Sequence, residues 1–327
     1  MKLIKPSFEI IKQNYTIDDI YKSIELAGKV SHKSEHTIKK GSAKEFVDRM
    51  IKLGHGATLE FGTIYLYYKV DNPSAMIKEI INFYSNNKYS EVVRIDTHDD
   101  NYSECGMGRV YNIVYSEYFI TTNLRVCIEN NRQEYLTNAL CKPTEHHKKR
   151  ICVKFICDRG IANEFVRHRK FSFLQESTRY CNYSKDKFDN EITYILPPWI
   201  SEFDVHNFYE NPKGDNFIRY NENNLGGSFI FLFNLEELEK AYIALIKEEG
   251  WKPEQARAIL PNSLKTELYM CGFESDWKHF FSLRVKKLSK GNPHPQADEL
   301  ASPLYDKFIE FGYIKNNAIF LDYIKEF

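Results

Sequence analysis

The chain has 327 residues, and its 45 basic and 45 acidic side chains give a formal net charge of zero. This length suffices for one large domain or two modest ones, and the balanced charge provides no field that would hold nucleic acid nonspecifically. No apolar run approaches the ~20 residues of a membrane span, and the N-terminus lacks the apolar segment of a signal peptide, so we expect a cytoplasmic protein that binds neither nucleic acid nor membranes.

Two helices are predicted near the N-terminus. Thr16, followed three residues later by Asp19, matches a capping box, and apolar residues recur on one helical face as far as Ala27. Ser42 is the expected N-cap of a second helix, which Gly54 ends.

The remaining elements alternate between strands and helices. The expected series in chain order is a strand over 63–70, a helix over 75–84, two strand-like runs over 111–128, and a strand over 151–157. Three helices are expected after this strand. The first carries residues 163–169, and the second runs over 235–249, with Asn234 as its N-cap and Gly250 as its stop. Pro253 begins the third, which carries Arg257.

Seven scattered cysteines, none in a Cys-x-x-Cys pair, predict neither a disulfide framework nor a zinc site. His146 and His147 are adjacent but lack a partner at metal-binding spacing, so a solvated loop is favoured there and no metal site is expected. No cysteine follows a proline. Cys181 lies near the motif described next, and a structural role is favoured for it over a nucleophilic one.

Residues 167–180 contain a dense group of hydrogen-bond donors. Arg167, His168 and Arg169 are consecutive, and Ser177 and Arg179 follow them after a partly apolar stretch. A guanidinium offers a rigid fork of N–H groups that matches phosphate or an ionised pyrimidine edge. For one arginine a packing salt bridge would be the safer interpretation, but the whole group indicates an anion-binding site.

The spacing Arg-His-Arg, seven residues, Ser resembles the signature of the flavin-dependent thymidylate synthases. Further segments resemble that family in the same order, and they are 27–31, 54–60, 256–261, 280–284 and 295–299. The resemblance covers about 16–70 and 151–310. It implies one domain over 1–327 with an α+β fold, a central mixed β-sheet flanked by helices, and the Arg-His-Arg segment at a helix end. Residues 71–150 and 201–233 are expected to be insertions.

The resemblance also implies a reaction, the reductive methylation of dUMP to dTMP. Methylenetetrahydrofolate would donate the carbon, and FAD reduced by NADPH would supply electrons, without a cysteine nucleophile. Arg284 would be catalytic, because a fixed guanidinium stabilises negative charge on the uracil. The expected dUMP ligands are Arg167, Gln175, Glu176, Ser177, Arg179, Arg257 and Arg284, and the expected FAD or folate ligands are Ser31, His55, Arg167, His168, Arg169 and His279. A homotetramer with active sites shared between subunits is expected.

The chain departs from the family pattern mainly where flavin or folate ligands are expected. The departures are Phe61 after Glu60, Glu164 in place of Gln, Leu174 in place of Asn, Phe273-Glu274-Ser275 in place of Asn-x-Arg, and His279 in place of Asn. Two alternatives therefore stay open: a noncatalytic nucleotide-binding relative, and a relative that makes a different 5-substituted pyrimidine. A nucleic-acid-binding protein is a third alternative, which the zero net charge disfavours.

Overall fold

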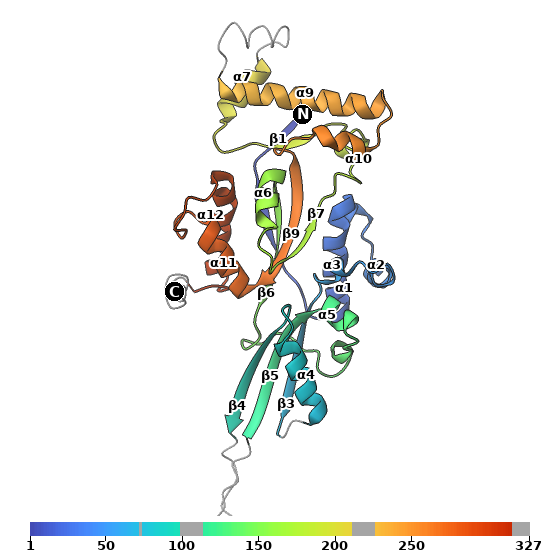
Figure 1. Ribbon diagram of the computed structural model, residues 1–327, viewed down its shortest axis with the longest axis vertical. Coiled ribbons are helices and arrows are strands. Elements are labelled where there is room, and N and C mark those ends of the chain that lie inside the picture. The colour runs from blue at the N-terminus through green and yellow to red at the C-terminus, as the bar shows by residue number, and fades with distance from the viewer. Residues whose placement is uncertain (72–73, 99–113, 211–225, 316–327) are drawn as a thin grey trace, which may run out of the picture.

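The computed structural model describes residues 1–71, 74–98, 114–210 and 226–315, and the elements given below lie within these residues. The molecule is elongated, with three layers stacked along its long axis (Figure 1). The middle layer is a four-stranded antiparallel sheet in the order β2-β6-β9-β7. Its strands are β2 (Ser7–Ile11), β6 (Arg150–Asp158), β9 (Lys265–Phe273) and β7 (Ser172–Gln175).

Helices cover both faces of this sheet. Alternate residues of β9 point to opposite sides, so each face presents apolar side chains to a group of helices. Leu268 and Met270 pack into the larger core, which the helices on one side close. Tyr269 and Cys271 pack on the other side with Val30, which follows the first helix. The first group of helices is α6 (Arg159–Phe165), α11 (Glu274–Arg284) and α12 (Pro295–Glu310), and the second is α1 (Ile17–Lys29), α2 (Ser42–Lys52) and α3 (Gly56–Leu59).

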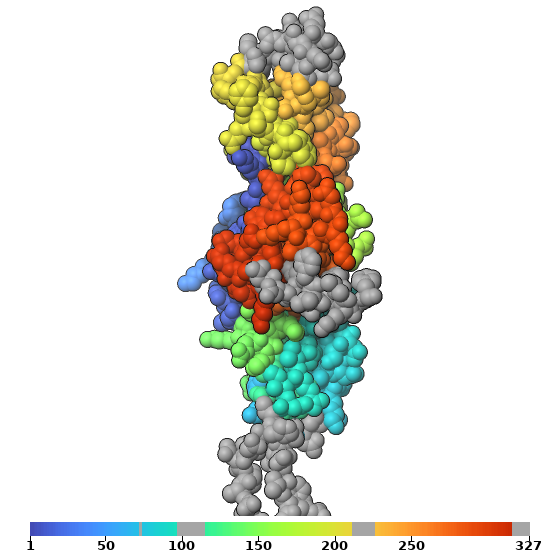
Figure 2. Space-filling model, turned by 90° about the vertical axis from the view of Figure 1, so that its left-hand side faces the viewer, coloured from blue at the N-terminus to red at the C-terminus, as the bar shows by residue number. Residues whose placement is uncertain are grey.

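The two end layers differ in composition. One end is a three-stranded antiparallel sheet, β3-β5-β4, with two short helices, and the other contains the long helix α9 beside a parallel pair, β1-β8. Figure 2 shows helices α11 and α12 between these ends. The bounds are β3 (Thr63–Val70), α4 (Ala75–Ser85), β4 (Glu91–His98), β5 (Val114–Asn123), α5 (Leu124–Glu129), β1 (Lys2–Ile4), β8 (Thr193–Ile195), α7 (Glu202–Glu210), α9 (Gly227–Lys247) and α10 (Pro253–Ala256).

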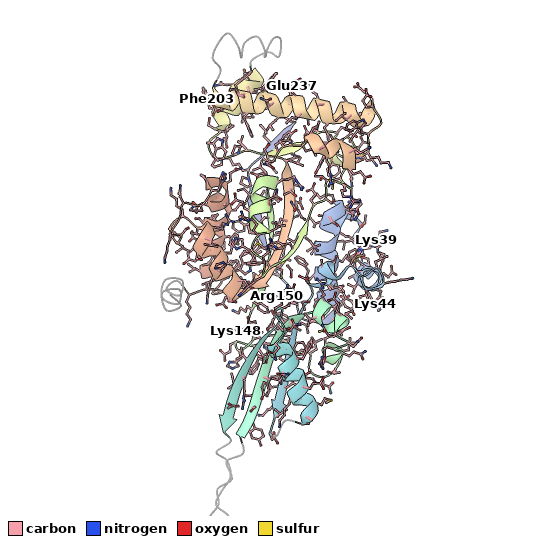
Figure 3. All side chains as sticks on the ribbon, in the orientation of Figure 1. Lys39, Lys44, Lys148, Arg150, Phe203 and Glu237 are labelled. Atoms are coloured by element: carbon pink, nitrogen blue, oxygen red, sulfur yellow. The ribbon has the colours of Figure 1, made fainter. Side chains whose placement is uncertain are left out.

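Arg150 lies where the middle sheet meets the three-stranded sheet (Figure 3). Its Nη1 donates to the main-chain oxygen of Glu60 and, at 3.2 Å, to Oγ1 of Thr63. Its Nη2 donates to Oγ of Ser172 at 2.7 Å. One guanidinium therefore ties the start of β3 to the start of β7 and fixes the turn that precedes β7.

The α+β class is confirmed, with the refinement that the parallel pairing occurs in β1-β8 rather than in the middle sheet. The helix at Thr16 is confirmed with its capping box, as are the strand over 63–70 and the helix over 75–84. The described residues of 71–150 include α4, β4, β5 and α5, and those of 201–233 include α7 and the start of α9. That these two segments are insertions stays a prediction.

Two boundary predictions were wrong because side chains make local bonds that the pattern did not show. Asn123 caps α5 by accepting from Val126 N–H at 3.1 Å, so a helix follows β5 where a second strand was expected. Asn234 lies inside α9 instead of capping it, and its Nδ2 donates to the main-chain oxygen of Ile230 at 2.7 Å.

Two further boundaries are shifted. Gly41, with φ of +86°, is the N-cap of α2, and the hydroxyl of Ser42 instead donates to Glu25 at 2.8 Å. Helix α6 ends at Phe165, so residues 167–169 lie in the turn that follows it and not in the helix itself. None of the described helices combines the length and apolar character needed to cross a bilayer.

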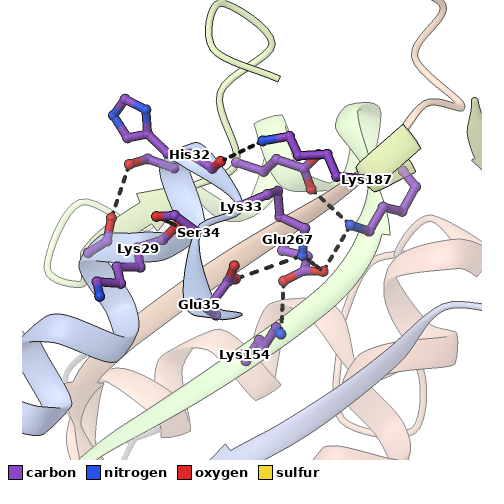
Figure 4. Close-up of polar contacts among 12 residues, drawn as sticks. Lys29, His32, Lys33, Ser34, Glu35, Lys154, Lys187 and Glu267 are labelled. Carbon is purple, nitrogen blue, oxygen red and sulfur yellow. Dashed lines mark hydrogen bonds and ion pairs between the residues drawn. The ribbon is translucent and has the colours of Figure 1, made fainter. Parts of the chain in front are cut away.

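A buried charge network joins the N-terminal turn to the middle sheet (Figure 4). The carboxylate of Glu267 on β9 contacts Lys33, Lys154 at 2.8 Å and Lys265 at 2.9 Å. Lys265 also contacts Glu176 at 2.9 Å, and Glu176 accepts from Tyr183 Oη at 3.1 Å. The network connects the turn after α1 to the residue that precedes Ser177.

The same network predicts a pH-dependent stability. Burial raises the pKa of Glu267, but the charge of Lys265 and the hydrogen bonds from the lysines outweigh it and hold that pKa at about 2. Because the folded-state pKa lies below the usual 4.5, this stabilisation is present above pH 4.5 and is lost as pH falls toward 2. We expect Glu267→Gln to lower the free energy of unfolding by on the order of 3 kcal/mol at pH 7, as measured by urea unfolding.

Asp48→Asn is the matched control, because Asp48 pairs with Lys44 at 2.6 Å on the exposed surface of α2. An exposed pair of this kind contributes roughly 0.3–0.5 kcal/mol. The difference between Glu267→Gln and the wild type should narrow between pH 4.5 and pH 2. A difference that is constant over this range, or no larger than that of the control, would contradict the assignment.

Candidate active site

The turn between α6 and β7 faces α11 across a cavity of about 380 Å³, which we call the RHR pocket. Three cationic residues of the turn and the last residue of α11 contribute to its wall. Its lining residues are Arg167, His168, Arg169, Lys170, Phe171, Asp276, His279, Leu283 and Arg284. Five of the predicted site residues, Arg167, His168, Arg169, His279 and Arg284, therefore meet in one place.

His168 is a buried, neutral member of the pocket. Its Nε2 accepts from Nε of Arg284 at 3.2 Å, which assigns the ring proton to Nδ1. Burial, followed by the charges of Arg284, His279 and Arg167, lowers the pKa of His168 to about 4. The imidazole is therefore uncharged at neutral pH and offers one N–H donor, while the arginines supply the positive charge.

Arg284 is held by Glu164, one of the residues at which the sequence departs from the family pattern. Its Nη1 contacts Oε2 of Glu164 at 2.5 Å, and its Nη2 donates to the main-chain oxygen of Glu164 at 3.2 Å. The underlying helices α6 and α11 are packed together by Phe165 and Phe280, whose rings lie 5.0 Å apart. Sequence reasoning gave Glu164 no role, because it lies 120 residues from Arg284 in the chain.

Ser177 lies at the other end of β7, next to the turn after α1. Its N–H donates to the main-chain oxygen of Ser31 at 3.1 Å, and its Oγ accepts from Arg179 N–H at 3.3 Å. The ring of Tyr180 stacks on that of His32 at 4.1 Å. The structure thus brings together Ser31 and Ser177, which the sequence had assigned to different ligands.

Two more predicted arginines lie near this end of β7. Nε of Arg179 is 4.0 Å from Oε2 of Glu254 in α10, and Arg257 follows directly after α10. Both arginine side chains are exposed, and so both are open to an anionic ligand. We call Ser31, Ser177, Arg179 and Arg257 the serine half-site.

A cavity of about 700 Å³ between α1 and α2 adjoins the serine half-site. Ser31 and His55, both predicted FAD or folate ligands, line it, and so do Lys29, His32 and Arg49. Phe46, Met50 and Leu53 form an apolar wall. The cavity combines cationic and apolar surface, which suits a ligand that carries both an anion and a ring.

Gln175 and Glu176 make contacts within the protein. Nε2 of Gln175 donates to Oγ1 of Thr266 at 3.2 Å, and Glu176 is buried in the network of Lys265 described above. Their roles as dUMP ligands stay predictions. In the described structure the ion pair of Glu176 with Lys265 holds the chain just before Ser177. No feature of the local sequence indicated that Lys265 is its partner.

Strand β7 separates the RHR pocket from the serine half-site. Its four residues pair with β9 from Ser172 opposite Cys271 to Gln175 opposite Leu268, so the strand alone spans about 10 Å. Ser177 is not among the residues that line the RHR pocket. Within one chain the predicted site residues thus form two groups at opposite ends of a strand.

Comparison with known proteins finds a matching family model and similar curated proteins. The sequence model of the family described as "Thymidylate synthase complementing protein" matches residues 114–310. A flavin-dependent thymidylate synthase of Corynebacterium efficiens is 30% identical over 145 residues, which cover 44% of this chain and 52% of that protein. A probable flavin-dependent thymidylate synthase of Paramecium bursaria Chlorella virus 1 is 31% identical over 157 residues, which cover 46% and 62%. The matches thus span about half the length of these curated relatives.

Among solved structures, a UMP/dUMP methylase, PolB, from Streptomyces cacaoi bound with 5-Br dUMP aligns over 95% of this chain and 93% of its own, with 15% identity and a TM-score of 0.38. Thymidylate synthase X from Helicobacter pylori with FAD and dUMP aligns over 48% and 66%, with 19% identity and a TM-score of 0.32. The family match covers more than half of the chain and includes both ends of β7. The chain belongs to the thymidylate synthase complementing protein family.

Proposed function

We propose that the protein methylates dUMP to dTMP, with methylenetetrahydrofolate as carbon donor and FAD reduced by NADPH as electron source. The observation that carries this proposal is the RHR pocket, where a fixed guanidinium lies beside a neutral, buried histidine. The proposal is supported by the family to which the chain belongs and by relatives that are named flavin-dependent thymidylate synthases.

Arg284 has the properties required to polarise a uracil ring. It is only 17% exposed, and its guanidinium is oriented by bonds to Glu164 and His168 before any ligand arrives. A preorganised cation in a site with little water stabilises developing negative charge more strongly than a mobile surface cation. We therefore assign it the catalytic role, and we assign Ser177, Arg179 and Arg257 to the nucleotide phosphate and sugar.

The RHR pocket fits the phosphate-bearing part of a flavin dinucleotide. Arg167, Arg169 and Lys170 present cationic donors on one wall, and His168 and His279 add imidazole rings 6.1 Å apart. A volume of about 380 Å³ is at the small end of ligand sites, so this pocket would hold only part of FAD. When bound, the flavin supplies the electrons for reducing the transferred carbon unit, and the protein supplies binding and orientation.

Cys181 does not provide a nucleophile in this proposal. It is completely buried, and burial raises the pKa of its thiol to about 12. Only the thiolate is an effective nucleophile, so this cysteine would be unreactive at neutral pH. The dUMP ring would then be activated without a covalent bond to cysteine.

Two separated half-sites support an assembly in which subunits share active sites. A symmetric interface repeats each contact, so the RHR pocket of one subunit can face the serine half-site of another. We propose a homotetramer arranged in this way. Ligand residues at opposite ends of β7 would then act on the same nucleotide.

Incubation with radiolabelled methylenetetrahydrofolate, NADPH and dUMP tests the proposed reaction. We expect a yellow protein whose flavin absorbance is bleached by NADPH, and labelled dTMP as the product. Arg284→Ala should retain flavin but nearly abolish methylation, because loss of a preorganised charge partner typically costs several kcal/mol.

Arms with UMP and with other pyrimidine nucleotides identify the accepted substrate. A colourless protein that binds dUMP without turnover would indicate a noncatalytic relative. A 5-substituted product other than dTMP would replace the proposed product, and undiminished turnover by Arg284→Ala would refute the role of Arg284.

Ser177→Ala and Cys181→Ala distinguish a ligand from a nucleophile. A hydrogen-bond donor to a charged group contributes up to ~3 kcal/mol, so Ser177→Ala should weaken dUMP binding roughly tenfold to a hundredfold and leave measurable turnover. Cys181→Ala should have almost no effect on turnover. A dUMP adduct on Cys181 in intact-protein mass spectrometry, or complete inactivity of Ser177→Ala at saturating dUMP, would overturn a cysteine-independent mechanism.

A further inference from the structure

We propose that Glu164 is a positioning residue, which sets the plane of the Arg284 guanidinium and thereby acts on the bound nucleotide. This inference rests on the proposed function, in which Arg284 contacts the pyrimidine. It assigns a role to a residue that the sequence shows only as a departure from the family pattern. The carboxylate acts through Arg284 and not by touching the reacting atoms.

The contacts of Arg284 fix its orientation. A guanidinium has five N–H donors, and within the described residues three of them are engaged by Glu164 and His168. Glu164 uses both its carboxylate and its main-chain oxygen, so two points of α6 define the plane of the fork. Counting only acceptors on the described residues, one N–H on each Nη atom is left to meet a ligand in the RHR pocket.

Glu164 adds orientation rather than support for the fold. Its side chain is 32% exposed, at the edge of the helix pair. Neighbouring Phe165 is fully buried and carries the packing against Phe280. Removing the Glu164 carboxylate should therefore leave the α6–α11 interface in place while freeing Arg284.

Removing Glu164 has two opposing consequences, one from the loss of its negative charge and one from the loss of the orientation of Arg284, and this makes the proposal testable. Glu164 offsets one positive charge of a pocket that would bind an anion, so its removal strengthens the general attraction for dUMP. Loss of orientation instead reduces stabilisation in the transition state. Glu164→Gln removes the charge but keeps an acceptor oxygen, whereas Glu164→Ala removes both.

We expect Glu164→Ala to lower kcat by roughly tenfold or more, with a smaller change in the KM for dUMP. Glu164→Gln should keep kcat within about threefold of wild type, because its amide oxygen still accepts from Arg284. Glu310→Ala is the matched control, since Glu310 lies on α12, does not line the RHR pocket and pairs with Lys307 at 2.7 Å. Its kcat should equal that of the wild type.

Two readouts separate this inference from the proposed function. In protein labelled with ¹⁵N-arginine, the Nη signals of Arg284, assigned by their loss in Arg284→Ala, should be protected in wild type and Glu164→Gln and exchange-broadened in Glu164→Ala, because Nη1 donates to the Glu164 carboxylate. In calorimetric titrations with dUMP, Glu164→Ala should weaken binding in the wild-type background only, because without Arg284 the loss of a negative charge strengthens the attraction for the anion.

An unchanged Arg284 signal in Glu164→Ala would overturn the inference whatever the enzyme catalyses. An equal loss of kcat in the Gln and Ala variants would do the same. A loss of dUMP affinity in Glu164→Ala that persists without Arg284 would show that Glu164 contacts the nucleotide directly. Absence of dUMP binding and methylation in wild type, with the Arg284 signal behaving as expected, would refute the proposed function and leave the positioning of Arg284 by Glu164 standing.

Discussion

The antiparallel pairing of β7 with β9 is the constraint on which the arrangement of the site depends. The strand keeps Arg167–Arg169 at one end and Ser177 at the other, so the two ends of one sequence motif face different surroundings. Arg150 fixes the first end through Ser172, and Lys265 fixes the second through Glu176. A motif that looks continuous in sequence therefore builds two half-sites in space.

The positive charges near the two half-sites are neutralised in different ways. Beside the serine half-site, Glu267 and Glu176 neutralise lysines in a buried network, and Ser177 and the exposed arginines lie outside that network. In the RHR pocket, Glu164 pairs with Arg284 while His168 stays neutral. The buried carboxylates of Glu267 and Glu176 thus stabilise the fold, whereas the Glu164–Arg284 pair is partly exposed to solvent.

Local signals predicted much of the fold, and long-range partners were not predictable. The capping box of Thr16 and the β-branched pattern of β3 are determined within a few residues, and both were correct. Spacing singled out the motif arginines, of which Arg167 and Arg169 line the RHR pocket and Arg179 lies at the other end of β7, and their roles stay predictions. Glu164 and Glu267 were missed because their partners lie on segments far apart in sequence, where a charged residue looks like any solvated one. Sequence spacing also could not show that β7 separates the motif.

The central claim is that active sites are completed between subunits, and a mixing experiment tests it most directly. Arg284→Ala and a Ser177→Ala/Arg179→Ala double variant, each impaired in a different half-site, would be co-expressed with different tags, purified as mixed assemblies and assayed for dTMP formation. The account predicts that mixed assemblies regain roughly a quarter of wild-type activity, because random pairing rebuilds some sites from two intact halves. Mixed preparations no more active than the separate variants, together with a solution mass of a single chain, would contradict it.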